Sequence, residues 1–405
     1  MHKIFLVMVA IYLPSLPVAS DDFQDSYHNI PDPITTCLNA PTKACAFELS
    51  METAISEKLN IERAKVLIAV SRAMAETGKI DDARMTLNMA LEETRQSKMS
   101  FAVDAKMLDI APVYAMIGDV DRAIELAKTV PTPRGRDRIL SRSAERAALQ
   151  GDVAGARKIS QAVENRRRAI WVSLKAMQFL VYKDSKQGLV DFADSIYPAI
   201  IALERPADKL LAMVRLSMIY KAGGNNEKAR ILQEQTRDIG ESFTSYFVRA
   251  RIAAAQLEFA VIGGNKLSKD KALEDFLTSE KRMNSFMDKS SIANELGSAL
   301  AFAGHSNIAA GYARFYREIR EKSNYLKTIA QVSGKGANGV FSAAIEEVLK
   351  ESEAIENGYE ADEVRMNLLH AARGVGNLVL SRKIALAMQD DDNAAKALAL
   401  IIPLL

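Results

Sequence analysis

The chain has 405 residues, of which 48% are hydrophobic and 26% are charged, and its formal net charge is +2. These are the values of a folded globular protein, and they exclude a chain that is disordered over most of its length. Together with the export signal described next, the near-neutral charge also argues against nucleic acid as a partner.

Residues 1–20 have the pattern of a secretory signal peptide. His2 and Lys3 give a short basic start, residues 4–13 are ten consecutive apolar residues, and residues 18–20 offer small side chains at a cleavage position. A membrane-spanning helix needs about 20 apolar residues, and prolines interrupt this stretch. We therefore expect cleavage of residues 1–20, no transmembrane segment in the mature chain, and a periplasmic or secreted location.

Cys37 and Cys45 are the two cysteines of the chain. In an exported protein such a pair favours a disulfide, which would stabilise the fold by roughly 2–3 kcal/mol on the chain-entropy model. The alternatives are a redox pair or half of a metal site, but the spacing matches neither CxxC chemistry nor common zinc sites. The bridge would hold the first helix of the array, expected over residues 43–59.

Two consecutive copies of one unit lie between residues 104 and 163, and they align Gly118 with Gly151 and Ala123 with Ala156. Before each glycine, apolar and small residues recur at steps of three and four, the period of one buried helix face. Glycine ends a helix with a left-handed backbone, and an Asp or Asn that can cap the next helix follows it in five copies. Each unit is therefore expected to be a pair of helices that shelters its apolar faces against its neighbours.

The same turn recurs across residues 59–389, with two intervals of double length. Those intervals predict degenerate turns near residues 183–188 and 334–339, and hence about nine helix pairs. Extra residues after the turn at 264 predict a longer loop there. The flanking parts are an N-terminal segment, residues 21–58, and a capping helix or tail, residues 390–405. The turn glycines are Gly78, Gly118, Gly151, Gly224, Gly264, Gly304 and Gly376.

The order of small, tyrosine, glycine, apolar and alanine positions in one unit resembles the tetratricopeptide repeat family. The positions that carry it are Ala111, Tyr114, Gly118, Val120 and Ala123. The family's early tryptophan is absent and the period is irregular, so the chain resembles a divergent, exported bacterial member. The resemblance implies an all-α fold, a right-handed αα-superhelix, whose first helices line a concave wall that holds a peptide.

Basic residues concentrate between Pro131 and Arg168, where ten basic residues stand against four acidic ones. Three arginines step by four and share a helix face, and three more follow nearby. Arginine forks suit carboxylates, so these six are the candidate contacts for an acidic partner, and a solvated outer face is the alternative. Residues 344–363 are conversely acidic, with eight carboxylates against one lysine. The six candidates are Arg138, Arg142, Arg146, Arg166, Arg167 and Arg168.

Catalytic motifs are weak in this sequence. Glu241 and Ser242 resemble the opening of lytic transglycosylases, but the glycine-rich motif of that family does not follow. The GxGxxG spacing at residues 334–339 lacks a preceding strand and favours a turn between helices. His28, His305 and His370 show no metal-ligand spacing, so no metal or cofactor is expected.

The leading hypothesis is an exported, non-enzymatic helical-repeat scaffold that binds a protein or peptide partner in the bacterial cell envelope, with an acidic partner as the candidate that the arginines favour. One alternative is an envelope protein that acts on peptidoglycan or another polysaccharide through Glu241. A purely structural assembly subunit is the other alternative.

Overall fold

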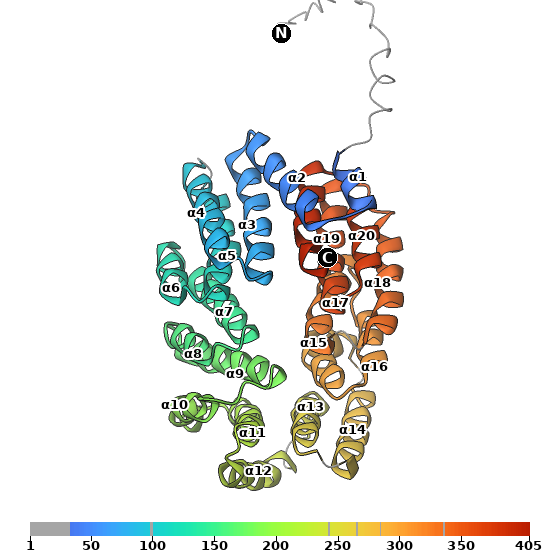
Figure 1. Ribbon diagram of the computed structural model, residues 1–405. Coiled ribbons are helices and arrows are strands. Elements are labelled where there is room, and N and C mark those ends of the chain that lie inside the picture. Colours follow the sequence, from blue (N-terminus) through green and yellow to red (C-terminus); the bar gives the residue numbers. More distant parts are fainter. Residues whose placement is uncertain (1–32, 98–99, 242–243, 265, 284, 335–336) are drawn as a thin grey trace, which may run out of the picture.

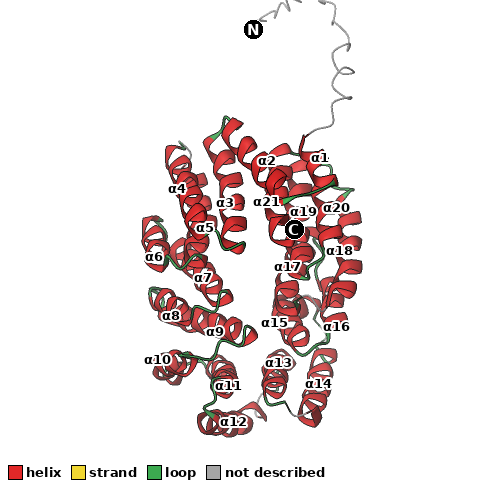
Figure 2. Cartoon of the chain, viewed as in Figure 1, coloured by secondary structure: helices red, strands yellow, loops and turns green. Residues whose placement is uncertain are grey.

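The computed structural model describes residues 33–405, apart from 98–99, 242–243, 265, 284 and 335–336. These described residues form 21 α-helices with short 3₁₀ turns and contain no strand (Figure 2). The all-α class is therefore confirmed, while residues 1–20, the expected signal peptide, lie outside the described part. No helix within that part is both long and apolar enough to cross a membrane.

Adjacent helices pack as pairs, and nine pairs run from α3 to α20 (Figure 1). The first helices of the pairs are α3 (Asn60–Glu76), α5 (Ser100–Met116), α7 (Pro133–Leu149), α9 (Arg166–Tyr182), α11 (Pro206–Ala222), α13 (Tyr246–Ile262), α15 (Phe286–Phe302), α17 (Ile319–Ser333) and α19 (Gly358–Gly374). The second helices are α4 (Ile80–Gln96), α6 (Val120–Thr129), α8 (Val153–Gln161), α10 (Leu189–Ile201), α12 (Asn226–Glu241), α14 (Lys266–Lys281), α16 (Ser306–Gly311), α18 (Asn338–Ser352) and α20 (Leu378–Leu386).

First helices pack against the first helices of the neighbouring pairs and form an inner layer, and second helices lie outside them (Figure 1). In each layer the buried residues are the apolar and small ones that recur in the sequence pattern. The small residue five places after the turn glycine is buried in every copy, because it lies where the two helices of a pair approach each other. These positions are Ala83, Ala123, Ala156, Ala229, Ala309 and Ser381.

The turns have the predicted chemistry with one exception. Asp152, Asn225 and Asn377 each accept a hydrogen bond from the backbone amide three residues later, at 2.8, 3.1 and 2.9 Å. Asp119 makes no such bond; its carboxylate lies 3.7 Å from Arg84 Nε in the neighbouring pair. The cap expected at 265 lies outside the described residues.

Both degenerate turns are where the spacing predicted them. At the first, Asp184 has φ 55° and takes the place of the turn glycine, since aspartate is among the few residues that tolerate the left-handed region. At the second, Gly334 has φ 66° between α17 and α18. The longer loop expected after Gly264 is wrong: α14 begins at Lys266, and the additional polar residues, several of them good helix formers, extend that helix instead.

The two ends of the array meet. Helix α21 (Asp391–Ile401) packs against α2 (Lys43–Ser56), α3 and α19, and α1 (Pro33–Asn39) packs against α20 and α21 (Figure 2). Ser50 Oγ donates to the carbonyl of Ala395 at 3.0 Å, and Arg382 Nε donates to the carbonyl of Leu38 at 2.7 Å. The array is therefore closed on itself, and its first helices face the inside of the ring. We call this inside, which holds the pocket described below, the central channel.

The disulfide predicted between Cys37 and Cys45 is present, with a Cα–Cα distance of 6.1 Å. It joins the end of α1 to the first turn of α2, the helix that packs on α21. The bridge therefore stabilises the segment through which the first and last parts of the chain are joined. It also indicates an oxidising compartment.

Candidate binding site in the central channel

One end of the channel is closed by side chains that join helices from the two walls. Gln178 Nε2 of α9 donates to Glu258 Oε1 of α13 at 2.6 Å, and the Tyr182 hydroxyl donates to the same oxygen. The rings of Tyr182 and Phe302 lie 4.5 Å apart, and Arg215 pairs with Glu295 at 2.6 Å. These contacts fill the space between α9, α11, α13 and α15.

Burial raises the pKa of the Glu258 carboxyl to about 7, although the Tyr182 hydroxyl and Arg215 both favour its charged form. The side chain is only 2% exposed, and it lines none of the pockets described below. We interpret Glu258 as part of the closure between the walls rather than as a group that meets a ligand.

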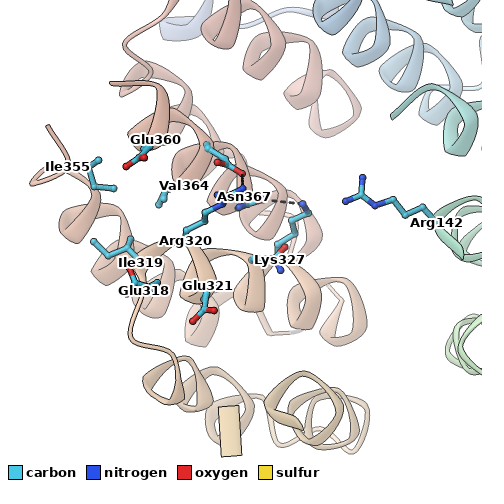
Figure 3. Close-up of a pocket in the computed structure, with 12 residues that line it drawn as sticks. Arg142, Glu318, Ile319, Arg320, Glu321, Lys327, Ile355, Glu360, Val364 and Asn367 are labelled. Atoms are coloured by element: carbon cyan, nitrogen blue, oxygen red, sulfur yellow. Dashed lines mark hydrogen bonds and ion pairs between the residues drawn. The ribbon is translucent and has the colours of Figure 1, made fainter. Parts of the chain in front are cut away.

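Toward the other end lies a pocket of about 760 Å³, lined by α17, α19 and, from the opposite wall, Arg142 of α7 (Figure 3). Glu318 and Glu360 lie at one end of this row, and Lys327 and Asn367 lie at the other end, facing Arg142. The start of α17 and α19 is thus lined mainly by carboxylates, together with Arg320, which pairs with Glu363, and Lys327 follows farther along α17.

Beyond that point, basic side chains from six helices dominate the electrostatics: α3, α5, α7, α17, α19 and α21. Eight basic and four acidic groups influence one another there, so this part of the inner surface carries an excess of positive charge although the whole chain is nearly neutral. We call this set the cationic wall. Its basic members are Lys65, Arg72, Lys106, Arg142, Arg146, Lys327, Arg373 and Lys396, and its acidic members are Glu62, Glu76, Asp109 and Glu145.

Burial and mutual repulsion disfavour the charged forms of several of these basic groups, and their pKa values are lowered as a result. Burial, reinforced by neighbouring arginines, lowers the pKa of Lys327 to about 8, and burial with neighbouring lysines lowers that of Lys396 to about 8. Burial and Arg146 lower the pKa of Arg72 to about 10. Burial and the adjacent cations hold the pKa of His370 well below its usual value, so its ring is neutral at physiological pH.

The six predicted arginines do not share one surface. Arg142 lines the large pocket, and Arg146 belongs to the cationic wall, whereas Arg138 is exposed one turn earlier on α7. Arg166 and Arg167 line a separate pocket of about 290 Å³ between α9 and α11. Arg167 pairs with Asp208 at 2.6 Å, and Arg168 pairs with the buried Asp137 at 2.8 Å, so carboxylates already occupy both.

Several polar residues of the inner layer were not foreseen as parts of the site, although the repeat pattern carried a signal for them. Arg72, Gln178, Glu258 and His370 all stand six places before the turn residue of their pair. That position faces the channel, so polar residues there mark the inner wall. Lys327 and Lys396 have no such signal, because α17 is shorter than the other first helices and α21 lies outside the pairs.

The remaining candidates lie elsewhere. Glu241 is the last residue of the outer helix α12, and its side chain is outside the described part, as are His28, Ser242 and residues 335–336. His305 precedes α16, and burial lowers its pKa. No group of His, Cys, Asp and Glu with the arrangement of a metal site occurs among the described residues.

No protein-family model matches this chain, and no curated protein matches it either.

Proposed function

We propose that this chain is an exported, non-enzymatic scaffold that binds an acidic segment of a protein or peptide partner in its central channel. The observation that carries the proposal is the cationic wall, whose positive excess is concentrated on the inner layer of a nearly neutral protein. The tetratricopeptide-like pattern of the sequence supports the same use of first-helix side chains, and a right-handed superhelix is part of this proposal.

Charge and geometry both favour a carboxylate-rich ligand. Like charges that are packed together and partly desolvated destabilise the protein unless something of opposite charge joins them. Arg142 and Arg146 lie one turn apart on α7, and Arg142 faces the opposite wall across the pocket (Figure 3). Their guanidinium groups can hold carboxylates through paired hydrogen bonds.

The proposed setting is the bacterial cell envelope. The disulfide between Cys37 and Cys45 supports an oxidising compartment, and the signal-like pattern of residues 1–20 supports export. No cofactor or metal enters the proposal.

The test is binding of a fluorescein-labelled oligoglutamate peptide, with oligolysine as the opposite-charge control. We expect oligoglutamate to bind at low salt, and Arg142→Glu with Arg146→Glu to weaken it by at least about tenfold, since two attractive contacts become repulsive. Arg157→Glu, on the outer helix α8, is the matched control and should bind like the unmodified protein. Equal binding by all three proteins would contradict the proposal.

The enzymatic alternative has its own test. Incubation with purified peptidoglycan should release no soluble fragments if the protein is a scaffold. Release that disappears in Glu241→Gln would overturn the scaffold proposal, because that carboxylate would then be an acid catalyst.

A further inference from the structure

Within the cationic wall, four helices bring basic groups together around His370. Arg72 comes from α3, Arg146 from α7, Lys327 from α17 and Arg373 from α19, and all four influence the imidazole of His370. These segments are far apart along the chain, so only the closure of the array makes them neighbours. We call these four cations and His370 the inner cluster.

Protein carboxylates neutralise little of the inner cluster. Glu76 pairs with Arg373. The other two acids nearby are shared with basic groups outside the cluster: Asp109 lies 3.5 Å from Lys106, and Glu145 lies 2.7 Å from Lys175. Four cations against one committed carboxylate leave an excess of three positive charges.

The cluster also contains hydrogen-bond donors without protein acceptors. Within the described part of the chain, the Nε atoms of Arg72 and Arg373 are buried and have no partner, and Arg146 makes no ion pair within 4.0 Å. Buried guanidinium donors in folded proteins are normally satisfied, so donors of this kind indicate a place for an acceptor from outside the chain.

Other contacts hold the cluster in position. Asn367 accepts a hydrogen bond from Lys327 Nζ at 3.0 Å and donates one to Ser323 Oγ at 3.3 Å. Arg373 Nη1 lies 3.5 Å from His370 Nδ1, and its Nη2 reaches Glu76. The basic groups are thus preorganised, which lowers the entropic cost of binding.

We infer that the inner cluster is an oxyanion site that binds the phosphate or carboxylate groups of a multivalent anion. Guanidinium forks recognise planar and tetrahedral oxyanions through paired hydrogen bonds, and a ligand with two or more negative charges would balance the excess. The site is distinct from the pocket rim, where Glu318, Glu321 and Glu360 would repel such a ligand and Arg320 is already paired with Glu363. The oxyanion can belong to a free small molecule or to the acidic partner of the proposed function.

The probes are inorganic phosphate, pyrophosphate and the oligoglutamate peptide, titrated calorimetrically into the disulfide-bonded protein at low salt. We expect pyrophosphate to bind one site more tightly than phosphate. Arg146→Gln and Lys327→Met should each weaken pyrophosphate by at least about tenfold, because each removes a charged contact. Arg157→Gln is the control and should bind normally.

A second measurement separates a binding role from a structural one. Removing one of several crowded cations should leave the ligand-free melting temperature unchanged or raise it, while binding falls. Melting temperatures that fall in both variants would show that these cations support the fold, and would overturn the inference. Absence of pyrophosphate binding, or equal loss in Arg157→Gln, would overturn it too.

Comparing the two probes also distinguishes a failure of this inference from a failure of the proposed function. Pyrophosphate binding without oligoglutamate binding supports the oxyanion site and contradicts the acidic-partner proposal. Oligoglutamate binding without pyrophosphate binding supports the acidic-partner proposal and contradicts the oxyanion site. If both probes bind and compete with each other, the oxyanion bound by the inner cluster belongs to side chains of the acidic partner. If both bind independently, it belongs to a free small anion.

Discussion

Glu258→Gln should stabilise the protein at alkaline pH and leave it unchanged at acidic pH. Glu258 is 2% exposed, and burial raises its pKa from an ordinary value of 4.5 to about 7. Between these two values the folded state keeps a proton that the unfolded state has lost. The free energy of unfolding therefore falls as the pH rises through this window, and the cost is absent below it and complete above it.

The magnitude follows from the shift. A difference of about 2.5 pKa units corresponds to roughly 3 kcal/mol between protonation states. Glutamine avoids this cost but loses the charge-assisted bonds from Gln178 and Tyr182, so we expect a net gain of about 1–2 kcal/mol at pH 8 and about zero at pH 4.

Urea denaturation at the two pH values measures this difference. Glu227→Gln, an exposed position on α12, is the matched control and should change the free energy of unfolding equally, and little, at both. If Glu258→Gln is no more favourable at pH 8 than at pH 4, then Glu258 is ionised in the folded state without cost. The reasoning about its burial would then be wrong.

Three further changes test the closure and packing of the array. Cys37→Ser should lower the free energy of unfolding by roughly 2–3 kcal/mol on the chain-entropy model, and an unchanged urea midpoint under oxidising conditions would contradict it. Asp362→Ala should lower the free energy of unfolding by about 3–5 kcal/mol, because it leaves the buried Arg365 without its ion pair. It should also speed hydrogen exchange in α21, because it removes the acceptor of backbone amides just before that helix. Normal protection of α21 would refute this. Gly297→Ala should cost about 1–3 kcal/mol, since its Cβ would lie 2.1 Å from a tyrosine hydroxyl of α17, whereas Gly311→Ala meets open space and should be nearly neutral; equal melting temperatures for the two variants would count against the close packing.

The sequence by itself determined the local units. Turn residues, caps and the three-and-four spacing of apolar residues act within one helix pair, so the pairing of adjacent helices and even the turn at Asp184 were predictable. The cysteine pair was predictable for the same reason, because its partners lie eight positions apart.

Only the tertiary structure decided what meets in the channel. Whether a stack of helix pairs stays open or closes depends on small rotations accumulated over all its pairs, and no single residue encodes that sum. Closure places Arg72 and Arg373, from opposite ends of the array, beside Arg146 and Lys327. The charge of each residue was visible in the sequence, but their proximity arises from the geometry of the whole chain.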